Sequence, residues 1–272
     1  MIPLTAEDLL PDILHGSYAA IEPGLALRLA AQELARGRSR KEAIKAVRSK
    51  LHQVGGAYQP APPDYARARA ELAALPAERS DPALHEFCRR WLGQHTSTRE
   101  RLPLLESKPH FYTLTLGSLG PLHSILDLAC GLNPLSLPWL PLAPQATYTA
   151  CDIYRDLTDF VQDFFRHVQQ PGTAMLCDLT ENIPDMPAQL TLLLKTLPCL
   201  EQVDKKVALR LLNGLRSEYL LVSFPSRSLG GRGRGMVENY ATHFEALLLH
   251  SPWQLVERRL FANEQTFLLH HA

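Results

Sequence analysis

The chain has 272 residues, and its 28 basic and 28 acidic side chains give a formal net charge of zero at neutral pH. This length can bury a sizeable core in one or two domains. No apolar run approaches the roughly 18 residues of a membrane-spanning helix, and the acidic start Met1–Asp8 lacks the basic region of a signal peptide. We therefore exclude a membrane-embedded protein and expect a cytoplasmic one.

The cysteines and histidines show no pattern of metal ligands. None of the five cysteines belongs to a CxxC pair, and the eleven histidines lack the short spacing that zinc sites use. We expect free thiols in a reducing compartment, and no bound metal.

The part of the chain before about residue 106 has the periodicity of helices. Ser39 and Glu42 form a capping box that opens one of them. Proline-rich breaks separate the later helices. The segments with helical patterns are 23–35, 40 onward, 65–75 and 83–93. These features predict an amino-terminal helical domain over residues 1–106, followed by a second domain over residues 107–272.

A basic stripe follows one side of the predicted helix that begins at Arg40. Between Arg28 and Lys50 there are eight basic residues and two acids. The stripe consists of Lys41, Lys45, Arg48 and His52. It runs beside an apolar face made of Ile44, Val47, Leu51 and Val54. A solvated helix face is the ordinary reading of such a stripe. Because acids for i,i+4 pairing are nearly absent, we favour contact with phosphates.

The second half begins with a strand and a tight turn. His123–Leu128 is a short apolar run, and Gly131 follows it in a turn. A glycine there lets the backbone approach a ligand closely, since it has no Cβ. A single glycine makes a poor phosphate cradle, because the dinucleotide fingerprint has three. The turn suits a ligand without phosphate, such as S-adenosylmethionine.

Three successive predicted strands end in an aspartate, at Asp127, Asp152 and Asp178. Asp152 lies 25 residues after Asp127, which is close to the spacing of a βαβ unit whose second carboxylate reaches the ribose hydroxyls of a nucleoside. Each aspartate alone could be the cap of a following helix. The series favours ligand-facing acids and a nucleoside-type cofactor.

From about Phe111 onward, predicted strands alternate with helices, which indicates a mainly parallel α/β sheet with helices on both faces. Lys195 follows the fourth apolar run, 190–194. The loop Arg227–Gly235 follows the fifth strand and carries three arginines that could grip phosphates or a guanine edge: Arg227, Arg232 and Arg234. A flexible solvated loop is the alternative. The last two strands, 253–261 and 265–270, have the pattern of a hairpin.

Five segments, in order over nearly the whole chain, closely resemble the aminoglycoside-resistance 16S rRNA (guanine-N7) methyltransferases of the Arm/Rmt and actinomycete self-resistance type. The segments are Leu51–Gln53 with Gly56–Tyr58, His95–Pro103, Leu128–Leu135 with Pro138–Trp139, Thr191–Glu201 and Phe224–Met236. The chain departs from the family at Gly55, where a bulky residue is common, and at Gly231 and Gly233 in the arginine loop.

The resemblance implies a class I Rossmann-like methyltransferase sheet that uses S-adenosylmethionine. It implies methylation of N7 of one guanine in the decoding-site helix of 16S rRNA, within the 30S subunit, by a monomer that confers aminoglycoside resistance. The implied cofactor-binding residues are Arg99, Ala129, Gly131, Asp152, Ile153, Asp178, Leu179 and Lys195.

Within this set the resemblance assigns separate roles. Asp152 binds the ribose, Asp178 with Leu179 the adenine, and Arg99 the methionine carboxylate, a pairing that suits a guanidinium. Lys195 and Arg232 are the expected catalytic residues, which place the acceptor base. The expected RNA contacts are Lys41, Lys45, Arg48, Arg227, Arg232 and Arg234.

Ser97 and Glu100 match a second capping box, so the alternative reading of this segment is that its polar residues only start a helix. Two other classes of function stay open at this point. The chain could methylate a small molecule or a protein, against which the basic residues speak. It could also be a silent RNA-binding relative, against which the complete set of cofactor residues speaks.

Overall fold

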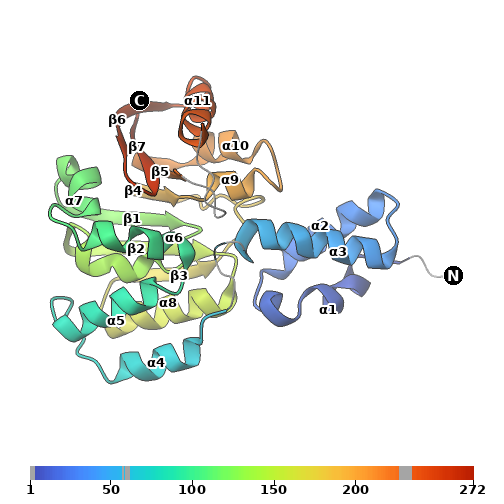
Figure 1. The fold of residues 1–272 in the computed structure, drawn as a ribbon, viewed down its shortest axis with the longest axis horizontal. Coiled ribbons are helices and arrows are strands. Elements are labelled where there is room, and N and C mark those ends of the chain that lie inside the picture. Colours follow the sequence, from blue (N-terminus) through green and yellow to red (C-terminus); the bar gives the residue numbers. More distant parts are fainter. Residues whose placement is uncertain (1–3, 57, 59–61, 227–234) are drawn as a thin grey trace.

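The computed structural model describes residues 4–56, 58, 62–226 and 235–272. In this part of the chain one mixed sheet has the strand order β3-β2-β1-β4-β5-β7-β6 (Figure 1). The first five strands pair in parallel, and β7 pairs antiparallel with both β5 and β6. The strands are β1 Leu122–Leu128, β2 Leu142–Asp152, β3 Gly172–Leu176, β4 Pro187–Leu194, β5 Arg216–Pro225, β6 Trp253–Leu260 and β7 Glu264–His271. The predicted class I α/β sheet and its carboxyl-terminal hairpin are confirmed.

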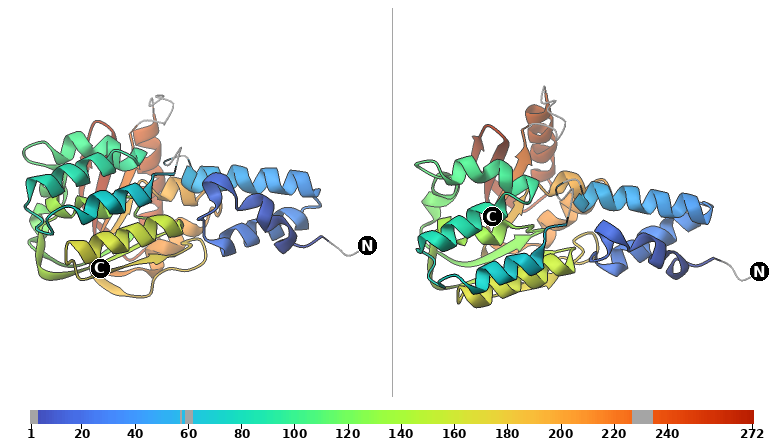
Figure 2. Two further views of the ribbon diagram at one scale, coloured as in Figure 1. Left: turned by 90° about the horizontal axis from the view of Figure 1, so that it is seen from below. Right: turned by 60° about the horizontal axis from the view of Figure 1, so that its bottom comes forward.

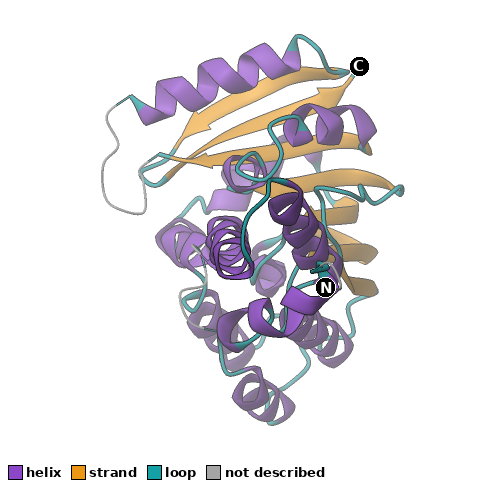
Figure 3. Ribbon diagram, turned by 90° about the vertical axis from the view of Figure 1, so that its right-hand side faces the viewer, coloured by secondary structure: helices purple, strands orange, loops and turns teal. Residues whose placement is uncertain are grey.

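Helices cover both faces of this sheet (Figure 3). The helices before β1 are α1 Leu10–Ile13, α2 Pro23–Ala35, α3 Arg40–Leu51, α4 Tyr65–Ala73, α5 Pro82–Leu92, α6 Thr96–Leu105 and α7 Phe111–Leu116. Those between and after the strands are α8 Arg155–His167, α9 Leu197–Leu200, α10 Val207–Gly214 and α11 Met236–Leu248. A 3-10 helix, η5 Asn133–Trp139, follows β1, and a short π-helix, η3 His52–Gly56, follows α3.

Alternating side chains of the central strands enter two apolar cores. In β1, Ile125 joins a core with Phe160 of α8, whereas the next residue, Leu126, joins the opposite core with Phe244 of α11. This alternation follows from the period of two along a strand. Burial of both faces explains why the strands are continuously apolar.

The helices before β1 divide into two groups. Helices α1–α3 form a lobe that stands to one side of the sheet (Figures 1 and 2). Helix α4 instead lies along α8, where Arg69 pairs with Asp163 at 2.6 Å and Tyr65 stacks on Phe160. The expected helical domain 1–106 therefore contains a separate lobe and a set of helices, α4–α6, that belong to the covering of the sheet.

The lobe is anchored at the end of β2 and at the loop after β3. Glu22 N donates to Ile153 O at 2.8 Å, and Ile21 forms an antiparallel bridge with Tyr154. Arg28 of α2 pairs with Asp178 at 2.6 Å and with Glu181 at 2.9 Å. The lobe is thus attached directly to the two loops for which a cofactor role is predicted.

A buried charge cluster joins α6, β4 and β7. Arg101 makes a two-pronged contact with Glu264, with nitrogen–oxygen distances of 2.9 and 3.1 Å, and the Lys195 ammonium lies 2.6 Å from Glu100 and 3.2 Å from Glu264. Arg101, Lys195 and Glu264 are each 1% exposed. Burial raises the pKa of Glu264, but the two cations beside it outweigh that effect and hold the pKa below its ordinary value.

We predict that Glu264→Gln strongly destabilises the fold. Removing one partner of a buried ion pair leaves its cations uncompensated, which costs about 3–5 kcal/mol. Urea denaturation measures this loss. Glu257→Gln on the adjacent strand β6 is the control, because Glu257 is 36% exposed and its loss should change stability by no more than about 0.5 kcal/mol. Equal stability of the two variants would show that the cluster is not needed for folding.

Candidate functional site

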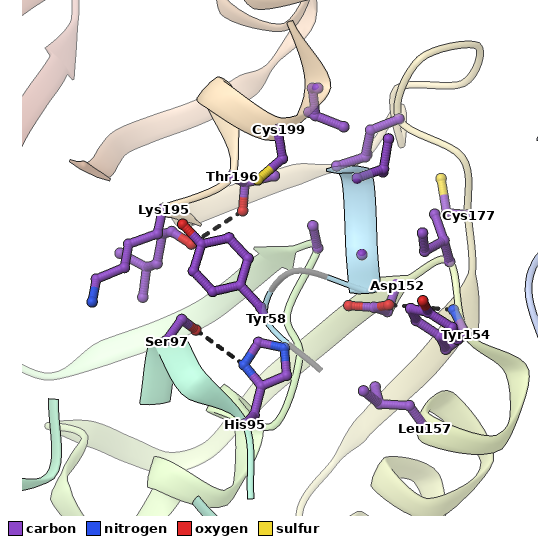
Figure 4. A pocket seen from close by; sticks show the side chains of 17 residues that line it. Tyr58, His95, Ser97, Asp152, Tyr154, Leu157, Cys177, Lys195, Thr196 and Cys199 are labelled. Atoms are coloured by element: carbon purple, nitrogen blue, oxygen red, sulfur yellow. Dashed lines mark hydrogen bonds between the residues drawn. The ribbon is translucent and has the colours of Figure 1, made fainter. Parts of the chain in front are cut away.

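A cavity opens at the carboxyl ends of β1, β2 and β4. Ligands bind at this edge in open α/β sheets. Figure 4 shows Asp152 and Tyr154 on one side of the cavity, Lys195 and Thr196 on the other, and Tyr58 and His95 between them. Apolar walls are contributed by Ile153, Leu157, Leu179, Leu194 and Leu200.

Asp152 is the carboxylate of this cavity. Its side chain is 7% exposed. Oδ2 accepts a hydrogen bond from Gly131 N at 2.9 Å, and Oδ1 accepts one from Tyr154 N at 3.2 Å. Burial raises the pKa of Asp152, and the backbone N–H donors of Gly131 and Tyr154 partly offset that rise. The carboxylate is therefore held in place by the backbone, with lone pairs left for a ligand's hydroxyl groups.

Gly131 is required by its backbone angle and by a close neighbour. Its φ is +50°, and a Cβ at this position would lie 3.0 Å from Cε1 of the His95 ring. A positive φ is costly for residues with a side chain. The turn after β1 thus brings His95 of the segment before α6 against the backbone that holds Asp152.

The structure brings five of the predicted cofactor residues together as lining of the cavity: Ala129, Asp152, Ile153, Leu179 and Lys195. Gly131 is not among the lining residues, but its backbone N–H donates to Asp152. The other two lie differently. The Asp178 carboxylate is held by Arg28 and by Thr180 and borders a neighbouring hollow. Arg99 is exposed and donates to Thr96 at 3.4 Å. The cofactor roles of all eight residues stay predictions.

One expectation about this edge was wrong. Asp127 does not face a ligand, because it is buried under η5 and its Oδ2 accepts from Asn133 at 2.9 Å and from Tyr148 at 2.6 Å. The capping box is not formed at Ser97, because α6 begins at Thr96 with His95 as its N-cap. Ser97 Oγ lies 3.2 Å from His95 Nδ1 instead, and Glu100 contacts Lys195.

Sequence reasoning missed several residues that line the cavity. Val54, Gly55 and Tyr58 come from the end of the lobe, and Tyr154 follows Asp152 directly. A Cβ on Gly55 would lie 2.7 Å from the Tyr154 ring, so the small residue at this position makes room for that tyrosine. Tyr58 and His95 stood in the matched segments without a role. The position of Tyr154, two residues after the strand-end acid Asp152, could have predicted that it lies near the site.

The predicted RNA contacts on α3 differ in their surroundings. Lys41 and Lys45 are exposed and form no ion pair with any residue that the structure describes. Arg48 donates to the Ile13 carbonyl at 2.9 Å and lies over the Tyr18 ring, so it also supports the lobe. Arg227, Arg232 and Arg234 lie outside the described residues.

Many of the basic side chains between Arg28 and Lys50 form ion pairs with acids of the same chain. Arg36, Arg38 and Lys50 all contact the buried Glu33, and Arg40 contacts Asp12. No helix in the described part of the chain is long and apolar enough to cross a membrane. The same residues contain no group of three or more side chains able to hold a metal ion.

We predict that Asp127 makes stability depend on pH. Burial raises its pKa from 3.8 to about 7, so the folded chain holds this proton more tightly than the unfolded chain does. The contribution is fully present below the unfolded pKa and is lost as pH rises to about 7, on the order of a few kcal/mol. Asp127→Asn keeps an oxygen for Asn133 and Tyr148 and cannot titrate. As the pH rises to about 7, the unfolding free energy of Asp127→Asn, measured by urea titration, should therefore increase relative to that of the unsubstituted protein. A difference that does not change with pH would contradict the assignment.

Comparisons with known proteins agree with this geometry. The family model described as "Ribosomal RNA methyltransferase (FmrO)" matches residues 15–268. A 16S rRNA (guanine(1405)-N(7))-methyltransferase from Micromonospora rosea is 34% identical, with 93% of this chain and 92% of that protein covered. One from Serratia marcescens is 33% identical, with 98% of both chains covered.

Solved structures give the same result. The 16S rRNA methyltransferase RmtF, in complex with S-adenosyl-L-homocysteine, superposes with a TM-score of 0.84 at 33% identity, with all of both chains covered. The 16S rRNA methylase RmtB gives a TM-score of 0.81 at 30% identity, with 99% of this chain and all of that chain covered. The chain belongs to the ribosomal RNA methyltransferase family described as FmrO.

Proposed function

We propose that the protein transfers a methyl group from S-adenosylmethionine to N7 of a guanine in the decoding-site helix of 16S rRNA, within the 30S subunit, and thereby confers aminoglycoside resistance. It acts in the cytoplasm as a monomer. The observation that carries this proposal is the cavity at the sheet edge, with the buried carboxylate of Asp152 at one end and Lys195 at the other, in a chain of this family.

The residues of the cavity fit the cofactor. Asp152 has lone pairs for ribose hydroxyls, and the apolar side chains of Ile153, Leu157 and Leu179 can hold an adenine ring. Burial lowers the pKa of His95 to about 4, so its ring is neutral at physiological pH and adds no positive charge beside a sulfonium. Arg99, exposed on α6, is our candidate for the methionine carboxylate.

The reaction requires positioning more than proton transfer. When bound, the cofactor supplies an electrophilic methyl group on its sulfonium sulfur. N7 of guanine has a lone pair that carries no hydrogen, so no general base is needed. The chain then has to hold the nucleophile, the methyl carbon and the sulfur in line. Such positioning can lower the activation barrier by roughly 7–11 kcal/mol. Lys195 and Arg232 are our candidates for placing the acceptor base.

RNA binding is proposed for the lobe and for the arginine loop. Lys41 and Lys45 of α3, which pair with no acid among the described residues, lie on a lobe that stands away from the sheet (Figure 2). Arg48 and the loop arginines Arg227, Arg232 and Arg234 complete the proposed contacts. In this division residues 1–106 recognise RNA, chiefly through α1–α3, and residues 107–272 carry the methyltransferase site. A guanine within an RNA helix must be flipped out, and phosphate contacts can offset that cost.

The direct test is to incubate the purified protein with isolated 30S subunits and isotope-labelled S-adenosylmethionine. Mass spectrometry of nuclease fragments then locates the label. We expect one labelled N7-methylguanine in the decoding-site helix. Label on a ribosomal protein, on another nucleotide or nowhere would reject the proposal.

We predict that Asp152→Ala weakens cofactor binding. Losing hydrogen bonds to a charged group costs on the order of 1.5–3 kcal/mol, which corresponds to a dissociation constant raised by roughly tenfold or more. Calorimetric titration with S-adenosylhomocysteine measures it. Asp159→Ala, on an exposed position of α8, should bind normally. Unchanged affinity of a folded Asp152→Ala protein would remove this residue from the site.

We also predict that the double substitution Lys41→Glu and Lys45→Glu weakens 30S binding and leaves cofactor affinity unchanged. Each lost phosphate contact should lower the slope of log affinity against log salt by about one. The control reverses two exposed arginines on the sheet covering, Arg67→Glu and Arg166→Glu. Filter binding at several salt concentrations compares them. Equal loss in both double variants would mean that overall charge, and not the lobe, governs binding.

A further inference from the structure

Asp178 lies between two residues that line the cavity, but its own side chain does not line it. Cys177 and Leu179 belong to the cavity wall, and Figure 4 shows Cys177 there. The Asp178 side chain borders the neighbouring hollow, together with Arg28 of α2. The turn after β3 therefore presents Leu179 to the cavity and its carboxylate to the lobe.

Arg28 holds this turn on both sides of Leu179. Asp178 Oδ2 accepts from Arg28 Nη2 at 2.6 Å, and Asp178 Oδ1 accepts from Thr180 N at 2.9 Å. Arg28 also donates to the Thr180 hydroxyl, and its Nε lies 2.9 Å from Glu181 Oε1. The planar guanidinium can contact several acceptors at once. Because Asp178 is 6% exposed and Arg28 24%, water screens this contact only in part.

The same helix holds a second apolar residue of the cavity. The backbone N–H of Glu22, the N-cap of α2, donates to the Ile153 carbonyl at 2.8 Å. Ile153 and Leu179 are two of the side chains proposed to hold the adenine ring. A flat ring is attracted only by atoms that touch it, and a gap of about 0.5–1 Å already loses a quarter to a half of that attraction. The placement of Leu179 therefore matters for affinity.

We propose that Arg28 is a positioning residue for the cofactor, which acts through Asp178 to hold Leu179 against the adenine ring. This proposal rests on the proposed function and gives the lobe a part in cofactor binding. Asp178 then serves the adenine by the shape of its turn, with its carboxylate directed to Arg28. The adenine does not react, so the contact stabilises ground state and transition state equally and affects KM, not kcat.

The test compares substitutions at both ends of the ion pair. The variants are Arg28→Ala, Asp178→Asn, the two combined, and Arg28→Lys, which keeps one charge for Asp178 but lacks the planar fork. Arg36→Ala is the control, because Arg36 directly follows α2, is 57% exposed and pairs with Glu33, which keeps Arg38 and Lys50 as partners. Calorimetry measures S-adenosylhomocysteine binding, and thermal melting reports folding. Methylation of 30S subunits at varied S-adenosylmethionine concentration separates KM from kcat.

We expect Arg28→Ala to raise the dissociation constant on the order of threefold to thirtyfold, the range for residues that act on a site through their neighbours. KM for S-adenosylmethionine should rise with it, at unchanged kcat. Arg28→Lys should lose a smaller factor, and Arg36→Ala should bind normally. The double variant should lose no more than the weaker single variant, because both substitutions remove the same contact.

Unchanged affinity of a folded Arg28→Ala protein, or of Arg28→Lys if the alanine variant does not fold, would overturn the role of Arg28. A double variant that loses the product of the two single factors would overturn the route through Asp178. A lower kcat at unchanged KM would also contradict the proposal. Failure of the unsubstituted protein to bind S-adenosylhomocysteine would instead overturn the proposed function.

Discussion

The contact between Arg101 and Glu264, with Lys195 beside them, is the interaction on which the rest of the site depends. It places full charges where almost no water reaches them, so each charge needs its partner in the folded chain. Arg101 comes from α6, Lys195 from the end of β4 and Glu264 from the start of β7. The cluster therefore fixes α6 against the end of β4 and the start of β7, and its lysine lines the cavity.

A second set of contacts fixes the side of the cavity on which we propose that the cofactor binds. Asp152 is held by backbone N–H groups of Gly131 and Tyr154, and the segment that follows it is bonded to the lobe through Ile153. The lobe also contributes Val54, Gly55 and Tyr58 to the wall of the cavity. A lobe proposed to bind RNA thus shares its anchoring contacts with the pocket proposed to bind the cofactor. Any shift of the lobe on RNA binding would move the residues proposed to hold the cofactor, and the coupling would act equally in both directions.

Local patterns predicted the elements well. The apolar runs before Asp127 and Asp152 gave β1 and β2 because continuous burial on both faces leaves a strong signal. The capping box at Ser39 is present in the structure, whereas the same pattern at Ser97 is not. The two segments differ because of a tertiary contact: Glu100 accepts a hydrogen bond from Lys195 and does not cap the start of its own helix.

Site residues were harder to predict wherever a long-range partner decides the outcome. A strand-end aspartate lines the cavity at Asp152 but is buried away from it at Asp127, because Tyr148 and Asn133 supply donors from 21 and 6 residues away. The Asp178 side chain is taken by Arg28, 150 residues earlier. Such long-range partners cannot be predicted from periodicity or spacing. The resemblance to the family identified the segments that carry Tyr58 and His95, but only the structure shows that these two residues line the cavity.

The most direct test of the account is a cryo-electron-microscopy structure of the protein on the 30S subunit with S-adenosylhomocysteine bound. The account predicts the ribose hydroxyls at Asp152, rRNA phosphates beside Lys41 and Lys45, and a flipped guanine whose N7 faces the cofactor sulfur at the cavity. A cofactor bound outside the cavity, or a target base that reaches the sheet edge away from Lys195, would contradict it.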